Sequence, residues 1–536
     1  MLDPLLLMVA LIAGVAIRRI NYPPMLGYLL AGFALNFLPL EPGPILDEIA
    51  DTGVTLLLFT IGLKLDLRQL AAPQVWAVAS VHMLASVLIM VPILYIGFAI
   101  FAAQSGISGS AIWLIAFALS FSSTVFAVKV FEDRGEMATI HAKVAIGILI
   151  MQDLAAVVFL GINSGKTPDF SVTMLVSAAL LLLSRPSLVA LLRRSGHGEL
   201  LLLCGITAAL GGSALFEAFN VKGDLGALAM GILLAGNNKS SELAGALLDM
   251  KDLLLVGFFV SIGLSGQPTA SEVLLGLALG LLVLFKPVLY FVLMTALRLR
   301  ARTSLLASLA LFNYSEFGLI VASLAASSGL LDEQWVIVLA LAMSFSFLLA
   351  TPLNARAYAI YHRYRRQLRR FERGPRLPAE TPGNPGDASV LILGMGRIGV
   401  GAYEYLTQVY GEAAVSGVET RTEQLATLRD MGVRAVIGDA TDEDFWSEID
   451  LSRIELIMVS LSKHSENKAV CELLLQLGYG GHLAVIARHP DQRKELRELG
   501  CIAFNLYQEA GFGFAEHVHL RIQGNTEEKF TVSHFT

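Results

Sequence analysis

Long apolar segments, separated by short polar or charged stretches, fill the first two-thirds of the chain. Thirteen of them are candidate membrane spans by length and hydropathy. They fall at about residues 5–17, 25–38, 50–63, 74–101, 111–129, 144–161, 171–192, 199–219, 223–236, 253–265, 272–297, 304–328 and 334–353. This pattern predicts a polytopic α-helical membrane protein. A composition of 55% apolar and only 16% charged residues supports the same class.

Basic residues gather in every second loop between these segments, and cytoplasmic loops are the ones that collect Lys and Arg. The basic loops hold Arg18 and Arg19, Lys64 and Arg68, Arg134 and Lys143, Arg193 and Arg194, Lys239 and Lys251, and Arg298, Arg300 and Arg302. The alternation predicts a multi-pass protein of the inner (cytoplasmic) membrane with its N-terminus outside. The opening MLDPLLLMVALIAGVAIRR has no basic leader and no small-residue cleavage site, so we expect a retained first helix.

The pattern changes twice after the last apolar segment. An arginine-rich stretch, which we expect to meet anionic lipid at the membrane surface, leads into the Pro/Gly-rich run LPAETPGNPGD. From Ala388, short apolar strands alternate with amphipathic helices, which predicts a parallel sheet of the Rossmann type. The predicted domains are a transmembrane domain (1–355), a linker (356–387), an α/β domain (388–515) and a C-terminal tail (516–536).

Asp153 lies in the middle of the apolar segment 144–161, with nine residues before it and eight after it. At 1.5 Å per residue it lies near the centre of a bilayer core of about 30 Å. Ionisable groups at that depth are costly and usually mark an ion or proton path. The alternative is a buried Asp that neighbouring hydroxyls and amides hold without a transport role. Other spans carry polar groups at their centres, namely Ser122, Ser123, Thr124, Lys286 and Glu316.

The serine-rich span is the fifth segment and the Glu316 span is the twelfth. Because this offset is odd, the two spans cross the membrane in opposite directions, as in an inverted repeat whose broken helices meet at the midplane. Half-helix ends there present positive N-termini and negative C-termini. We expect Lys286 and Glu316 to neutralise these ends, which leaves Asp153 as the titrating cation ligand.

The segment VLILGMGRIGVG places Gly394, Gly396 and Gly399 after a predicted strand and at the start of a helix. The glycines allow the backbone to approach a phosphate closely. Glu419 ends the next strand, where it can accept hydrogen bonds from ribose hydroxyls. Asp439 and Ala440 follow the third strand. The pattern predicts a nucleotide cleft; the alternative is a Rossmann-like dimerisation module that binds no nucleotide. About 100 residues follow Glu419, too few for a catalytic domain, so we expect a sensor and not an enzyme.

The runs LSFSSTVFA, ILIMQDLAAV, LVGFFVSIGL, LFKPVLY and YSEFGLIVASL resemble the Kef-type, glutathione-gated potassium-efflux branch of the monovalent cation:proton antiporters, over about residues 1–515. The resemblance implies a homodimer with a sodium/proton antiporter-like fold and an elevator-like movement. It places the family's intramembrane site on Gln152, Asp153, Lys286 and Glu316. One departure is 313–315, where relatives commonly carry a glycine-containing sequence.

The C-terminal region resembles the RCK or KTN regulatory domain of potassium transporters and channels. That resemblance implies AMP or NAD(H) as a regulatory nucleotide, with Arg397 and Arg488 as phosphate partners. An acidic loop couples this domain to the core in Kef-type exporters. Its counterpart here, NNKSSELAGALLDMKD, is diluted by Lys239 and Lys251, so we expect weak or absent glutathione gating.

These observations predict an electroneutral K⁺/H⁺ antiporter that a cytoplasmic nucleotide-binding domain gates. A Na⁺/H⁺ antiporter of the same fold is the main alternative. A nucleotide-gated potassium channel is less favoured because the chain has no carbonyl-filter loop of the TVGYG type. The net charge of −6 and the scattered basic residues indicate no nucleic-acid partner, and three cysteines make no disulfide framework. We expect no metal other than the transported cation.

Overall fold

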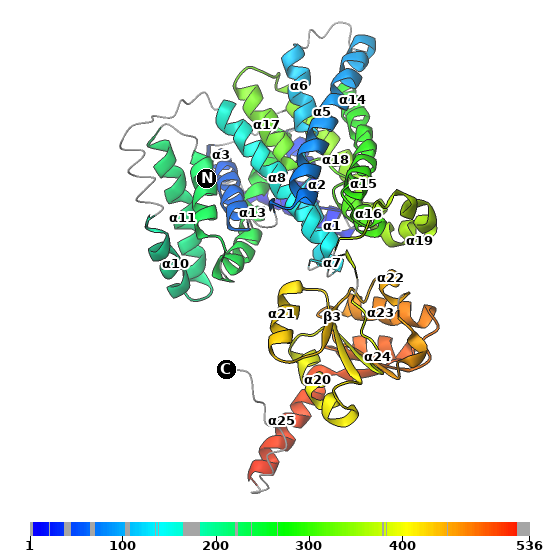
Figure 1. Ribbon diagram of the computed structural model, residues 1–536. Coiled ribbons are helices and arrows are strands. Elements are labelled where there is room, and N and C mark those ends of the chain that lie inside the picture. Colours follow the sequence, from blue (N-terminus) through cyan, green and yellow to red (C-terminus); the bar gives the residue numbers. More distant parts are fainter. Residues whose placement is uncertain are drawn as a thin grey trace. The chain divides into compact units, whose positions relative to one another are not determined.

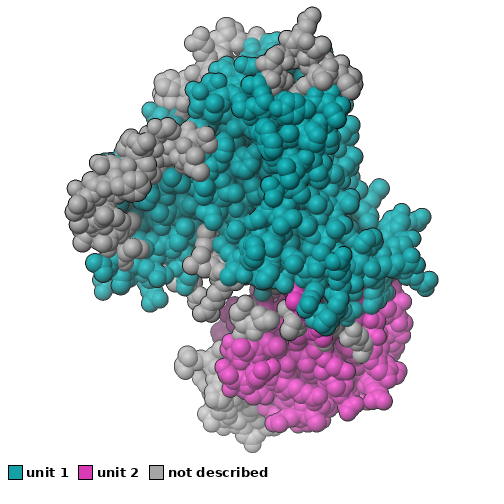
Figure 2. Space-filling view, turned by 45° about the horizontal axis from the view of Figure 1, so that its top comes forward, with its two compact units in different colours: residues 1–130, 141–376 teal, residues 131–140, 377–536 magenta. Residues whose placement is uncertain are grey.

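The computed structural model describes residues 4–20, 22–36, 44–64, 70–101, 108–134, 136–137, 139–163, 183–219, 223–236, 238–264, 266–377, 380–381, 383–447 and 449–522. Two compact units make up the chain (Figure 2). Unit 1 comprises residues 1–130 and 141–376, and unit 2 comprises residues 131–140 and 377–536.

The described residues of the N-terminal part form helices and their connections, without strands (Figure 1). Its helices are α1 (Pro4–Arg19), α2 (Pro24–Leu35), α3 (Pro44–Lys64), α5 (Pro73–Phe101), α6 (Gly109–Ala118), α7 (Thr124–Arg134), α8 (Ile140–Asn163), α10 (Arg185–Arg194), α11 (Glu199–Glu217), α12 (Gly223–Leu234), α13 (Asn238–Leu264), α14 (Ala270–Leu281), α15 (Phe285–Ala296), α16 (Ala301–Ala310), α17 (Glu316–Ser327), α18 (Gln334–Ala355) and α19 (Ala357–Leu368).

Many of these helices are apolar enough to lie in a membrane. Among the described residues, α5, α8, α11, the continuous stretch of α14 and α15, and α18 are long and apolar enough to cross it. α5 exposes Leu84, Leu88 and Ile96, side chains that suit contact with lipid. Most of the predicted segment 171–192 lies outside the described residues, and helices occupy the other predicted segments. The number of crossings therefore stays a prediction.

The helices of unit 1 pack into two groups. In one group α3 packs on α12 and α13, α2 on α1 and α13, and α11 on α12. In the other group α14 packs on α18, α15 on α5 and α16, and α17 on α6 and α18. Gly62 of α3 meets Gly231 of α12 so closely that a Cβ on Gly62 would lie 2.5 Å from the Leu228 carbonyl oxygen. Such small residues let helix backbones approach in a membrane.

Two breaks interrupt the second helix group, as the sequence predicts. α6 ends at Ala118 and α7 begins at Thr124, while α16 ends at Ala310 and α17 begins at Glu316. The broken helices pass close to each other, because a Cβ on Gly318 of α17 would lie 2.4 Å from the carbonyl oxygen of Ala118 at the end of α6. The crossed broken helices are therefore confirmed.

Unit 2 contains a six-stranded parallel sheet with the order β3-β2-β1-β4-β5-β6. Its strands are β1 (Val390–Leu393), β2 (Val415–Glu419), β3 (Ala435–Ile437), β4 (Leu456–Val459), β5 (His482–Ala487) and β6 (Ile502–Asn505). The helices that follow them are α20 (Arg397–Tyr410), α21 (Thr422–Asp430), α22 (Glu443–Trp446), α23 (His464–Gln476), α24 (Pro490–Glu498) and α25 (Leu506–Ile522). The strand order reverses between β1 and β4, where ligands bind in such sheets. The predicted Rossmann-like domain is confirmed.

Candidate functional site

Asp153 lies on α8 in the interior of unit 1, with 1% of its surface exposed. The Thr124 hydroxyl donates a hydrogen bond to its Oδ2 at 3.0 Å. Thr124 is the first residue of α7, and helix N-termini favour negative charge. The carboxylate is therefore held at the point where the chain resumes a helix after the first break.

Gln152 joins α8 to the first break. Its Oε1 accepts from the backbone N–H of Ser122 at 3.0 Å, and its Nε2 donates to the Tyr290 hydroxyl at 2.8 Å. The Ser122 hydroxyl donates to the Leu311 carbonyl at 2.9 Å and lies 3.2 Å from the Tyr290 oxygen. Because the Ser122 proton points to Leu311, the Tyr290 hydroxyl donates to Ser122. This chain of bonds fixes the orientation of the Gln152 amide.

Lys286 on α15 is fully buried, and its ammonium group binds both breaks. Nζ donates to the carbonyls of Phe121, at 2.7 Å, and Asn313, at 2.9 Å. Phe121 lies beyond the end of α6 and Asn313 beyond the end of α16, where helix carbonyls lack partners and the helix dipole is negative. The Tyr314 ring lies beneath the ammonium group at 5.2 Å. Lys286 therefore binds carbonyls just beyond the C-terminal ends of two helices.

Glu316 is the first residue of α17 and is fully buried. Ser315 caps this helix, because its hydroxyl oxygen accepts from the Phe317 N–H at 3.1 Å and its hydroxyl donates to Glu316 Oε2 at 3.4 Å. A carboxylate in the first turn complements the positive helix N-terminus. Lys286 and Glu316 therefore lie at helix ends of opposite polarity.

Asn313 connects the two breaks directly, although the sequence analysis assigned it no role. Its Oδ1 accepts from the Ser123 N–H at 2.6 Å, and its Nδ2 donates to the Ala310 carbonyl at 3.0 Å. Both side-chain groups are therefore used at the crossing. At 313–315, where this chain lacks the glycine-containing sequence, the Asn313 side chain therefore forms a hydrogen bond between the two breaks.

Tyr290 and His82 were not predicted as site residues either. The His82 ring on α5 stacks on the Tyr290 ring with centroids 3.5 Å apart and planes 5° apart. Both side chains are fully buried. One signal was available for Tyr290, since it follows Lys286 by four residues, about one helical turn. For His82 the signal was a lone imidazole in the apolar segment 74–101.

The glycine turn of unit 2 follows β1 and opens α20. Gly394 has φ of +87°, a conformation that L side chains rarely adopt. A Cβ on Gly399 would lie 2.1 Å from the Gly394 carbonyl oxygen, so only glycine fits. The Ser460 hydroxyl after β4 also donates to that carbonyl at 2.8 Å. Gly396 precedes the helix, and Arg397 is its first residue. Glycine turns that lead into a helix N-terminus are typical of phosphate-binding sites.

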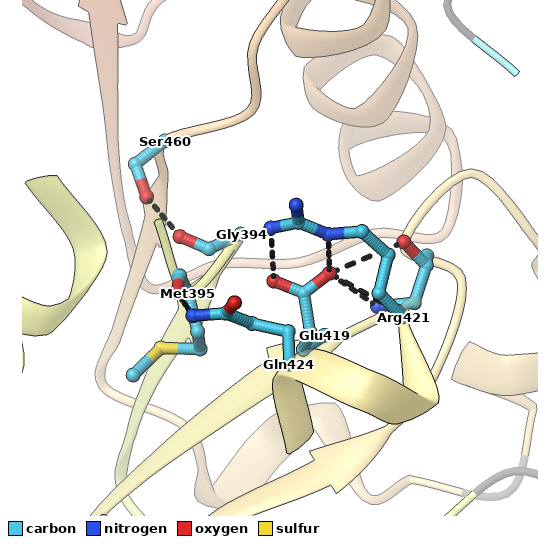
Figure 3. A network of polar contacts seen from close by, with 7 residues as sticks. Gly394, Met395, Glu419, Arg421, Gln424 and Ser460 are labelled. Atoms are coloured by element: carbon cyan, nitrogen blue, oxygen red, sulfur yellow. Dashed lines mark hydrogen bonds and ion pairs between the residues drawn. The ribbon is translucent and has the colours of Figure 1, made fainter. Parts of the chain in front are cut away.

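Glu419 ends β2 beside this turn and is 5% exposed (Figure 3). Its Oε1 accepts from the N–H groups of Thr420, at 3.0 Å, and Arg421, at 3.1 Å. The Arg421 side chain forms an ion pair with the same oxygen at 3.2 Å. Gln424 reaches the Met395 carbonyl of the glycine turn at 3.4 Å. Glu419, the candidate ribose ligand, is therefore already paired with Arg421.

The third-strand turn closes on itself. Asp439 Oδ1 accepts from the N–H of Thr441 at 2.9 Å and from its hydroxyl at 2.6 Å, and the Trp446 indole donates to the Ala440 carbonyl at 2.8 Å.

Glu466, in the first turn of α23, has a raised pKa. Burial of its carboxyl, with the nearby charge of Asp439 as a smaller cause, raises this pKa to about 7.

Arg488 lines a cleft at the carboxyl end of β5. It follows β5, two strands from β1 in the sheet. The cleft there holds about 230 Å³ and is lined by Lys463, His464, Arg488 and His489 together with uncharged residues. Leu461 also lines this cleft and lies against the glycine turn, because a Cβ on Gly394 would be 3.0 Å from the Leu461 Cδ2. The cleft of Arg488 therefore adjoins the glycine turn.

Comparisons with known proteins bear on both units. The family model "Sodium/hydrogen exchanger, transmembrane" matches residues 6–355, and the model "TrkA-N domain" matches residues 390–504. The protein named "Putative cation/proton antiporter YbaL" of Escherichia coli is 29% identical over 82% of this chain and 82% of its own length. The glutathione-regulated potassium-efflux system protein KefC of Cronobacter sakazakii is 27% identical over 92% and 80%.

A solved structure is also similar. The sodium proton antiporter MjNhaP1 of Methanocaldococcus jannaschii has a TM-score of 0.45 and 13% identity, over 68% of this chain and 96% of its own. The family model covers more than half of the present chain and includes the helices that carry Asp153 and Lys286. The chain therefore belongs to the sodium/hydrogen exchanger family, and a TrkA-N domain follows its transmembrane part.

Proposed function

We propose that the protein exports K⁺ in exchange for H⁺, with Asp153 as the site that the two ions share. The buried Asp153 carboxylate, bound by Thr124 where two broken helices cross, is the observation that supports this proposal. Oxygen ligands suit a hard alkali cation. The carboxylate and the hydroxyls of Ser122, Ser123 and Thr124 supply such ligands around the first break.

The exchange is electroneutral in this proposal. Gln152 is uncharged, so binding one K⁺ or one H⁺ changes the charge of the site equally. Lys286 is bound to two helix C-termini, and Glu316 begins a helix. Their charges offset helix dipoles. Asp153 is therefore the group that binds K⁺ and H⁺ in turn.

Potassium is the cation favoured by the relatives, because KefC of Cronobacter sakazakii carries potassium efflux in its name. Sodium is the second candidate, since the matching family model is described as a sodium/hydrogen exchanger. Purified protein in proteoliposomes, loaded with each cation in turn, separates these options. A K⁺ gradient that drives proton movement supports the proposal, and a response to Na⁺ alone contradicts it. Current without proton movement would indicate a channel.

A regulatory nucleotide, AMP or NAD(H), binds unit 2 in this proposal. The glycine turn, the start of α20 and the carboxyl ends of β2 and β3 support this assignment, with Gly394, Gly396, Arg397, Gly399, Glu419, Asp439 and Ala440 as lining residues. Arg488, which lines the adjoining cleft, is assigned with Arg397 to the phosphates of the ligand. Addition of AMP and of NADH to the full-length protein, followed by thermal unfolding, tests nucleotide binding.

We place the protein in the inner membrane as a homodimer, with unit 2 in the cytoplasm. Glutathione has little effect in this proposal. The stretch NNKSSELAGALLDMKD, the counterpart of the acidic loop of Kef-type exporters, was expected as a loop. It is helical from Asn238 onward, and Lys239 forms an ion pair with Glu242 at 2.9 Å. That pairing reduces the acidic character of the segment. A transport rate that changes strongly with glutathione or a glutathione adduct would contradict this part of the proposal.

A further inference from the structure

α19 belongs to unit 1, follows its last apolar helix and packs along one face on the other helices. Ala357 and Tyr361 of this face are buried, and Leu368 is partly buried. They contact α15 and the first turns of α16, through residues that include Phe291, Ala301 and Leu306. In Figure 1, α19 runs at an angle to α14 and α15. The helix is therefore attached to the end of the bundle and does not continue α18.

The opposite face of α19 and the 3₁₀ turn after it (Arg369–Phe371) carry arginine. Residues 356–376 contain eight arginines and one acidic residue, Glu372. Arg363, Arg366 and Arg370 are exposed. At about 100° per residue they lie on the side opposite to Tyr361. We call these three residues the arginine face. A surface of this kind is complementary to anions.

Two exposed aromatic residues flank the arginine face. Tyr364 is 46% exposed and Phe371 is 53% exposed. Tyrosine, such as Tyr364, concentrates at the membrane–water boundary, and clustered arginines beside a membrane span bind anionic lipid. Arginine also matches phosphate oxygens with two parallel hydrogen bonds. A lipid phosphate therefore fits this combination better than a protein partner does.

The same segment is fastened to the broken helix α16. Glu372 Oε1 accepts from the Ala301 N–H at 2.9 Å, which caps the N-terminus of α16. The Arg302 guanidinium lies over the Tyr358 ring at 5.5 Å. α16 leads directly to the Leu311 and Asn313 carbonyls, which bind Ser122 and Lys286 at the crossing. A displacement of α19 therefore acts on the half-helix that ends at the site.

We propose that the arginine face binds the phosphate groups of anionic phospholipids in the leaflet where α18 ends, and that this contact sets the transport rate through α16. Glu372 is the single acidic residue of the segment, and its Oε1 caps α16. The effect on rate rests on the proposed exchange activity, whereas lipid binding does not. A lipid changes the rate only if the active arrangement of α16 binds it more tightly than the inactive one.

Lipid binding is tested by thermal unfolding of the full-length protein in detergent with phosphatidylglycerol or phosphatidylcholine. The test variant is Arg363→Gln/Arg366→Gln/Arg370→Gln. The control, Arg18→Gln/Arg193→Gln/Arg194→Gln, removes the same number of exposed arginines from the ends of α1 and α10. Phosphatidylglycerol is expected to raise the melting temperature of the wild type and the control, and to raise that of the test variant less than half as much. An equal rise in all three proteins overturns the proposal. An equal rise with inorganic phosphate would assign the face to a free anion.

Coupling is tested in proteoliposomes of phosphatidylcholine with and without phosphatidylglycerol. Anionic lipid is expected to change the wild-type exchange rate about five-fold or more, which is the lower range of ordinary coupling. The test variant and Glu372→Ala, which removes the acceptor of the Ala301 N–H, should lose this response, while Glu372→Ala keeps the rise in melting temperature. A full response in Glu372→Ala would overturn the role of α16. If no protein exchanges cations in either lipid, the proposed function fails, and the melting experiment alone decides lipid binding.

Discussion

Substitution of Tyr290 by Phe should weaken cation binding without removing the fold. The change deletes one hydroxyl and keeps the ring that stacks on His82. That hydroxyl accepts from Gln152 Nε2 at 2.8 Å and donates to Ser122 Oγ across 3.2 Å. Its loss leaves a buried amide N–H unpaired beside Asp153, which costs about 1–3 kcal/mol. The Gln152 amide can then rotate away from the geometry that the site requires.

The expected result follows from the same magnitude. If the whole cost falls on the cation-competent arrangement, the apparent cation affinity decreases by roughly 5- to 150-fold, at 1.4 kcal/mol for each ten-fold. The assay is the dependence of cation-driven proton movement on cation concentration in proteoliposomes. KM should increase, with a smaller effect on the maximal rate.

Tyr314→Phe is the matched control. Its hydroxyl is also buried in the second helix group, but it donates to the Leu279 carbonyl at 2.9 Å and does not bind Gln152. Both variants should lose a similar amount of thermal stability. Only Tyr290→Phe should raise KM. An unchanged KM in Tyr290→Phe, or equal increases in both variants, would refute the assignment of Tyr290 as the residue that positions Gln152.

Three further predictions address the shared ion site and the nucleotide cleft. Asp153→Asn should abolish pH-dependent exchange in folded protein, because Asn does not release a proton; exchange that persists in proteoliposomes would contradict a shared site. Gly399→Ala should remove the rise in melting temperature caused by AMP or NADH, since its Cβ meets the Gly394 carbonyl, whereas Gly401→Ala on the same helix meets nothing within 4 Å and should retain the rise. The pKa of Glu466 is about 7 in the folded protein, whereas a Glu carboxyl in an unfolded chain has a pKa of about 4.3. The folded protein therefore binds the extra proton between these values, and the wild type should lose stability relative to Glu466→Gln as the pH rises through this range. Melting temperatures of the two proteins that run parallel from about pH 5 to 8 would show that the Glu466 pKa is not raised.

Features that depend on neighbouring residues in the chain could be derived from the sequence. Apolar segments, the basic loops between them and the alternation of strands and helices depend on local periodicity, so the helical membrane part and the Rossmann-like domain were predictable. Asp153, Lys286 and Glu316 were conspicuous because charge is costly in an apolar helix. The glycine turn was recognisable because Gly394 and Gly399 tolerate backbone positions that other residues do not.

Contacts between distant segments were decided only by the tertiary structure. Tyr290 lies 138 residues from Gln152, and Asn313 lies 190 residues from Ser123. No local pattern specifies which polar atoms meet across such separations, because packing selects the partners that satisfy buried donors and acceptors. For the same reason the sequence did not indicate that Arg421 pairs with Glu419 or that Glu372 caps α16. Local periodicity determined the elements, and the satisfaction of buried polar groups determined how they form a site.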